Sequence, residues 1–264
     1  MARAADVVKR IFVGRPMSYG ELEHTLLPKT IALPVFSSDA LSSVAYATQE
    51  ILLVLSLAGF AVLHLVVPIS LAVAGLLTLV VLSYRQTVRA YPTGGGAYRV
   101  TRENLGKYPG LLAASAILLD YVLTVAVSVT AGGDAVVAAV PSLEPFKLEL
   151  TLLFILFVAL MNLRGVKESG VFFAIPTYGF ILSVFALLVT GLVQCAGGCP
   201  VAASATHHLE IEQGLTFFLI LKAFAAGTTA LTGVEAISDG VPAFRYPQSK
   251  NAATTLAIMG SISI

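Results

Sequence analysis

The chain has 264 residues, of which 57% are hydrophobic and only 12% are charged, and its formal net charge is +1. Soluble domains carry about 25% charged residues, so this composition predicts an integral membrane protein and excludes an ordinary soluble domain. The small net charge provides no overall field that would attract nucleic acid. The first 30 residues are polar and mixed, which excludes a short cleavable signal peptide and predicts a soluble N-terminal segment.

Long apolar runs predict an all-α membrane protein. The runs are continuous and lack the alternation of barrel strands, and most exceed the about 20 residues that a helix needs to cross the hydrocarbon core. We therefore expect a cytoplasmic N-terminal segment at 1–30 and a transmembrane domain at 31–264. The predicted spans lie at 31–57, 62–84, 110–140, 149–163, 170–194 and 214–243, and a seventh begins near Ala252.

Basic residues predict the orientation, because cytoplasmic loops carry an excess of lysine and arginine. Of the 16 basic residues, fourteen fall in the N-terminal segment and in the loops after the second, fourth and sixth spans. The opposite loops hold only Lys147, so we expect a multi-pass protein of the cell membrane with a cytoplasmic N-terminus. Lys222 lies inside the sixth span, either as a counter-ion or reaching outward to the interface. Cys195 and Cys199, in an external loop, are either disulfide-bonded or reduced.

The first and sixth spans both contain residues that disfavour a continuous helix. In the first, Pro34 removes a backbone donor and the run Ser37–Asp39 prefers caps and turns, which predicts two half-helices meeting near 36–39. In the sixth, glycines and threonines at 227–229 and 232–233 interrupt the helix. Unwound backbone at membrane depth persists only where it lines a cavity, although each interruption is also consistent with an ordinary kink.

The spacing of the two interrupted spans, five helices apart, is typical of transporters built from inverted repeats. In that architecture, helices 1–5 at about 31–194 form the first repeat. The region 214–264 begins the second repeat. The two breaks would then meet near the bilayer midplane, where a small ion or polar solute can bind.

Acidic residues inside the spans are candidates for function, because a charge there costs roughly 2.5–3.5 kcal/mol on insertion scales. They are Asp39, Asp120 and Glu235, whereas Asp239 is expected at the cytoplasmic interface.

Hydroxyl groups accompany these acids. Thr124 and Ser128 follow Asp120 at i+4 and i+8 and so share its helix face. Tyr121 is expected to lean toward the same cavity, and Tyr46 lies two turns beyond Asp39. These hard oxygens, without thiol or imidazole, suit an alkali or alkaline-earth cation.

Structural interpretations of the same residues remain open. Asp39 would cap the second half of the first span, and the spacing of Thr232 and Glu235 fits a capping box. The small hydroxyl residues of the third span would allow close helix packing, and the two tyrosines would be packing aromatics. A cap oxygen can also face a cavity, so capping and ion binding are compatible.

Two cytoplasmic loops carry a family resemblance. YPTGGGAYRVTRENLG at 91–106 and NLRGVKESG at 162–170 resemble loops of the amino acid–polyamine–organocation (APC) superfamily. The resemblance implies a five-plus-five inverted repeat with a fold like that of the leucine transporter. Within the superfamily, SSDALSSVAYATQEIL, LLDYVLTVAVS and ALTGVEAIS resemble the KimA-type potassium importers, relatives of the Kup family.

This resemblance implies proton-coupled K⁺ uptake without a cofactor, the partners being the lipid bilayer, the potassium ion and the proton. One acid, with Glu235 as the candidate, would carry the proton. Such transporters have about twelve spans, so we expect the chain to be the N-terminal half, truncated within helix 7, of a protein that dimerises through other regions. The residues implied to bind or conduct the ion are Asp39, Tyr46, Asp120, Tyr121, Thr124, Ser128, Thr232 and Glu235; all but Thr124 and Ser128 would be direct K⁺ ligands.

The alternative functions are an amino acid or polyamine permease and a structural span bundle. Amino acid transporters of the superfamily usually receive the substrate carboxylate at bare N–H groups of a Gly-Ser-Gly-like break. Here Asp39 stands at that point and would repel a carboxylate while attracting a cation. The chain shows no phosphate loop or nucleophile–base constellation, which argues against an enzyme.

Overall fold

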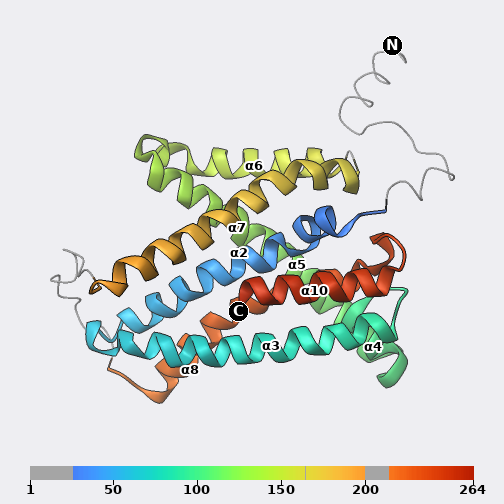
Figure 1. Ribbon diagram of the computed structural model, residues 1–264, viewed down its shortest axis with the longest axis horizontal. Coiled ribbons are helices and arrows are strands. Elements are labelled where there is room, and N and C mark those ends of the chain that lie inside the picture. The colour runs from blue at the N-terminus through green and yellow to red at the C-terminus, as the bar shows by residue number, and fades with distance from the viewer. Residues whose placement is uncertain (1–25, 164, 200–213) are drawn as a thin grey trace, which may run out of the picture.

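The computed structural model describes residues 26–163, 165–199 and 214–264 and is almost entirely helical in these ranges (Figure 1). Apart from one isolated parallel bridge between Leu27 and Phe244, the described ranges contain no β-structure, which confirms the predicted all-helical fold. The α-helices are α2 (Lys29–Ser56), α3 (Val66–Ala90), α4 (Gly96–Leu105), α5 (Lys107–Ala139), α6 (Lys147–Leu163), α7 (Val166–Ala196), α8 (Phe217–Gly227), α9 (Ala236–Asp239) and α10 (Gln248–Ser263). Short 3-10 helices are η2 (Phe60–Leu65), η3 (Pro141–Phe146), η5 (Thr228–Leu231) and η6 (Val241–Ala243).

In the described ranges, five helical segments are long and apolar enough to cross a membrane, and they match the second to sixth predicted spans. The first predicted span, α2, has 28 residues but is too polar to join this group. Helix α2 contacts α3, α7, α8 and α10, so its polar side chains contact other helices and not lipid. The five segments are Phe60–Ala90, Lys107–Ala139, Pro141–Leu163, Ser169–Ala196 and Phe217–Asp239.

The helices are arranged around α2. In Figure 1, α6 lies at one edge of the molecule and α3 at the opposite edge, with α7, α2 and α10 between them. Helix α5 contacts α4 and α6, and its only fully buried residues are two glycines, Gly110 and Gly133. Helix α2 is surrounded by other helices and carries serines and acids, whereas most of α5 is exposed on the outside of the helix bundle and is strongly apolar.

The core joins α2 and α3 to the end of the sixth span and to α10. Phe36 of α2 stacks on Phe244, with ring centroids 5.3 Å apart. The backbone N–H of Leu27 donates to the carbonyl of Ala243 at 2.8 Å, and the N–H of Arg245 donates to the carbonyl of Leu27 at 3.1 Å. The segment before α2 is thus fixed to the segment after the sixth span.

Helix α2 is continuous from Lys29 to Ser56, so the prediction of two half-helices meeting near 36–39 is wrong. The missing N–H of Pro34 deprives the carbonyl of Thr30 of its helical donor. The hydroxyl of Tyr178 in α7 donates to that carbonyl oxygen at 2.8 Å. This replacement satisfies the carbonyl, and the helix continues through Asp39, which therefore caps no half-helix.

The sixth span is broken as predicted. After η5, Thr232 is extended, with φ −64° and ψ 144°, and Gly233 has a φ of 80°. A side chain disfavours this left-handed conformation, which glycine adopts freely. A Cβ on Gly233 would lie 2.5 Å from Oδ2 of Asp39 and 2.9 Å from the backbone N of Ala40. The break therefore packs directly against α2 at its half-buried acid, Asp39.

Candidate functional site

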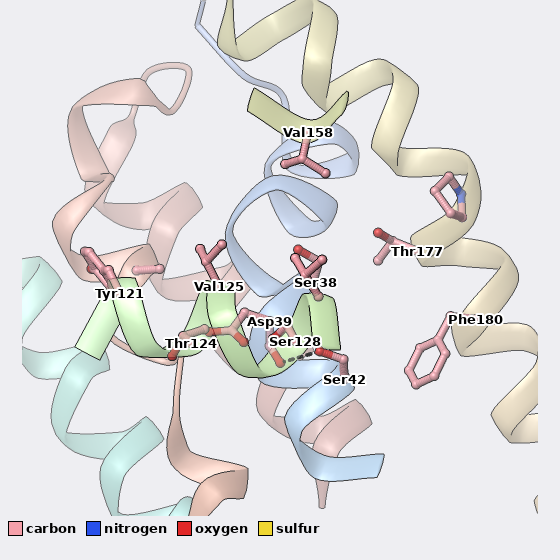
Figure 2. A pocket seen from close by; sticks show the side chains of 14 residues that line it. Ser38, Asp39, Ser42, Tyr121, Thr124, Val125, Ser128, Val158, Thr177 and Phe180 are labelled. Carbon is pink, nitrogen blue, oxygen red and sulfur yellow. Dashed lines mark hydrogen bonds between the residues drawn. The ribbon is translucent and has the colours of Figure 1, made fainter. Parts of the chain in front are cut away.

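A cavity of about 560 Å³ lies between α2, α5, α6, α7 and the break of the sixth span (Figure 2). Apolar side chains such as Val125 and Phe180 form much of its wall. Figure 2 shows its hydroxyl and carboxylate groups contributed by α2, α5 and α7. The polar lining residues are Ser38, Asp39, Ser42, Tyr121, Thr124, Ser128 and Thr177.

Helix α5 turns one polar face inward. Thr124 and Ser128 are half-buried and line the cavity, whereas Leu119 and Leu123 of the same helix are 64% and 63% exposed. The i, i+4 spacing predicted this shared face. Asp120 is also half-buried, one turn before Thr124, but does not line the cavity itself. Within the described ranges, the buried Oγ of Ser128 has no hydrogen-bond partner, which leaves it available to a ligand.

Ser43 brings three predicted site residues together. Its hydroxyl donates to Oδ1 of Asp39 at 3.4 Å and lies 2.7 Å from the hydroxyl of Tyr46 and 2.9 Å from that of Thr232. Ser43 is completely buried. Sequence reasoning did not single it out as a site residue, although its i+4 position relative to Asp39 placed it on the same helix face.

The predicted capping box of the sixth span is not formed. The Thr232 hydroxyl donates to the carbonyl of Thr229 at 2.8 Å, and α9 begins without a side-chain cap. One carboxylate oxygen of Glu235, Oε1, is buried and has no hydrogen-bond partner in the part of the chain that the structure describes. Glu235 lies within electrostatic range of Asp39 and Asp120. The three predicted acids therefore share one region of the molecule.

Tyr121 lines the cavity, but its hydroxyl makes a hydrogen bond to another helix. It donates to Oδ2 of Asp239 at 2.6 Å, which ties α5 to α9. Asp239, expected at the interface, is half-buried. Gly94 has a φ of 76°, and a Cβ there would lie 2.6 Å from the carbonyl oxygen of Asp239. The glycine-rich loop 93–96 thus closes over the end of α9.

The remaining candidates lie outside this region. Lys222 is exposed and makes no ion pair with any described residue, so the counter-ion interpretation is wrong. Cys195 and Cys199 form a disulfide at the end of α7. No group of three or more His, Cys, Asp or Glu residues with metal-binding geometry occurs in the described ranges. The polar side chains that line the cavity carry hydroxyl and carboxylate oxygens, the ligand types that hard cations prefer.

Comparison with known proteins identifies the family. Residues 36–264 match the model of the amino acid permease family. The chain belongs to this family. It is 44% identical over 256 residues to the potassium transporter KimA of Bacillus subtilis (strain 168), an alignment that covers 96% of the chain and 42% of KimA. This permease-family chain thus spans about two-fifths of the length of that relative, and the resemblance to KimA-type transporters is confirmed. Family membership and the five membrane-span-capable segments support a multi-pass location in the cell membrane.

Proposed function

We propose that the protein mediates proton-coupled uptake of potassium across the cytoplasmic membrane. The observation that carries the proposal is one cavity in which Asp39 of α2 meets Thr124 and Ser128 of α5 beside a broken helix. Such oxygens can replace part of the water around a cation, and the carboxylate compensates its charge. Oxygen chemistry alone does not separate K⁺ from Na⁺, so the choice of potassium comes from the similarity to KimA.

The proposed roles follow from position. Asp39, Thr124 and Ser128 contact the ion in the cavity, and Asp120 adds negative charge one turn away. Tyr46 and Thr232 reach the ion site through Ser43. Tyr121 shapes the wall and holds α9, since its hydroxyl is bonded to Asp239. These assignments keep all the predicted residues but change several roles. Of the six residues expected as direct ligands, only Asp39 keeps that role, while Thr124 and Ser128 become direct ligands.

Glu235 is the proposed proton carrier. Its Oε1 has no hydrogen-bond partner among the described residues and sits in the break of the sixth span, where Asp39 and Asp120 are close enough to interact with its charge. Proton uptake by Glu235 would reduce the repulsion among these acids, and cation binding would do the same. The bias of basic residues supports a cytoplasmic N-terminus, so the imported ion would leave on the side of that segment.

An amino acid or polyamine permease is the second candidate, favoured by the family model that the chain matches. In that case Asp39 would receive a substrate ammonium group. The position is unfavourable for an amino acid carboxylate, because the cavity offers a second nearby acid and no lining Lys or Arg among the described residues. The two candidates predict different substrates: a potassium transporter takes up K⁺, whereas a permease takes up an amino acid or polyamine.

The test is rubidium uptake and growth at limiting K⁺ in a bacterial strain that lacks its own potassium importers and expresses the full-length protein. We expect the double variant Asp39→Asn, Asp120→Asn to lose at least about tenfold in uptake, the equivalent of 1.4 kcal/mol. Asp134→Asn is the matched control, because Asp134 pairs with Lys147 at an exposed site, where ion pairs contribute little. Equal uptake by the double variant and the control defeats the ion site. Saturable uptake of a labelled amino acid that K⁺ does not affect supports the permease instead.

A further inference from the structure

Ser43 occupies the junction between α2 and the break of the sixth span. Its side chain has no exposed surface, and three side-chain oxygens surround its Oγ, those of Asp39, Tyr46 and Thr232. Within the described residues, the contact between Ser43 and Thr232 is the only side-chain hydrogen bond that joins α2 to the sixth span. A single hydroxyl therefore links two of the elements that line the cavity.

The donor and acceptor of each hydrogen bond around Ser43 follow from the number of protons available. Each hydroxyl has one proton to donate. Thr232 uses its proton on the carbonyl of Thr229 at 2.8 Å, so at the 2.9 Å contact Ser43 must donate and Thr232 must accept. Tyr46 then donates to Ser43 across 2.7 Å. The result is a one-way chain of hydrogen bonds from Tyr46 through Ser43 to Thr232.

The same proton of Ser43 has a second acceptor. The carboxylate of Asp39 can only accept when ionised, and its Oδ1 lies 3.4 Å from Ser43 Oγ. Asp39 and Thr232 therefore compete for one proton. A charged acceptor attracts a donor more strongly than a neutral hydroxyl, so the outcome depends on whether the charge of Asp39 is compensated.

We propose that Ser43 is a positioning residue that couples cation binding at Asp39 to the break of the sixth span. This inference rests on the proposed function. A cation at Asp39 weakens that carboxylate as an acceptor, and the Ser43 proton then goes to Thr232 and holds the break against α2. Without the cation, Asp39 draws the proton away, and the contact with Thr232 is lost. Binding of the ion and closure of the broken helix are linked through this hydroxyl.

The experiment compares Ser43→Ala with Ser37→Ala. Ser37 is an equally buried serine of α2, its Oγ has no hydrogen-bond partner among the described residues, and it does not line the cavity. We expect Ser43→Ala to raise the KM for rubidium uptake at least about fivefold, the lower end of coupling between linked sites. Ser37→Ala should stay within about twofold of the unchanged protein.

A second readout separates coupling from ordinary packing. Added K⁺ should raise the thermal unfolding temperature of the purified unchanged protein and of Ser37→Ala, and this shift should be reduced in Ser43→Ala. If Ser43→Ala yields too little folded protein, Ser43→Cys replaces it, since a thiol fills the site but donates weakly. If the Ser43 variant matches Ser37→Ala both in rubidium uptake and in the K⁺-dependent shift of the unfolding temperature, the proposed role of Ser43 is wrong, and the proposed function is unaffected. Absence of K⁺ uptake by the unchanged protein overturns the proposed function itself.

Discussion

Helix α2 and the sixth span carry similar residues but fold differently. Both contain small hydroxyl residues and an acid, and both were expected to unwind, yet only the sixth span is broken. The break contains Gly233 at a φ of 80°, whereas no residue of α2 leaves the right-handed region. Residues that merely disfavour a helix are therefore insufficient to interrupt one. The helix breaks where a glycine adopts a left-handed conformation and packs closely against another helix, as Gly233 does against Asp39.

The largest expected effect comes from Gly233→Ala. The new side chain would occupy a left-handed conformation, at a cost of about 1–2 kcal/mol, and would collide with Asp39 and Ala40. We expect rubidium uptake to fall to background and the unfolding temperature of the purified protein to fall as well. Uptake assays and thermal unfolding in detergent measure both quantities.

Gly75→Ala is the control for this substitution. Gly75 lies in α3, and a Cβ there meets nothing within 4 Å, so alanine should be neutral or stabilise the helix by up to about 1 kcal/mol. If Gly233→Ala behaves like Gly75→Ala, the break does not depend on the glycine conformation.

A second, intermediate effect is expected from the acids of the two elements. Asp39 in α2 accepts a hydrogen bond from Ser43, whereas Oε1 of Glu235 in the break has no partner among the described residues. If Glu235 exchanges the coupled proton, uptake by the unchanged protein increases as external pH falls, and Glu235→Gln flattens this dependence. Initial rates of rubidium uptake between about pH 5 and 8, the range where His and shifted carboxyl groups titrate, provide the measurement. A pH profile unaltered by Glu235→Gln assigns the proton to another group.

The smallest effect concerns the continuity of α2. Tyr178→Phe removes the hydroxyl that donates to the carbonyl of Thr30, and we expect a loss of about 1 kcal/mol in unfolding free energy. In a Pro34→Ala background the loss should shrink, because the new backbone N–H can donate to the same carbonyl. Thermal unfolding of the four variants of this double-mutant cycle checks the coupling. Additive effects would show that Tyr178 does not compensate for the proline.

Much of the fold was predictable because apolar runs report directly on burial in lipid. The spans from α3 to α8 follow from continuous hydrophobicity, and the inward face of α5 follows from the i, i+4 spacing of Thr124 and Ser128. The continuity of α2 was not predictable, since it depends on Tyr178, which lies 148 positions from Thr30 in the sequence. Local rules cannot foresee a donor that arrives from another helix.

The candidate site likewise has a part that the sequence predicts and a part that depends on long-range contacts. Residue type, helical spacing and the family resemblance together selected Asp39, Thr124 and Ser128, which line one cavity. The pairing of Tyr121 with Asp239 joins residues 118 positions apart, and the contact of Ser43 with Thr232 joins residues 189 apart. Such long-range partners decide whether a hydroxyl faces the cavity or supports a neighbour, and only the folded chain reveals them.

The bridge between Leu27 and Phe244 has a mechanical consequence. Two backbone hydrogen bonds and the stacking of Phe36 on Phe244 fasten the entrance of α2 to the exit of the sixth span. Any tilt of the segment beyond the break must therefore drag the first turns of α2 with it. The start of α2 and the end of the sixth span would therefore move together, and the chain would bend at Gly233, beside Asp39.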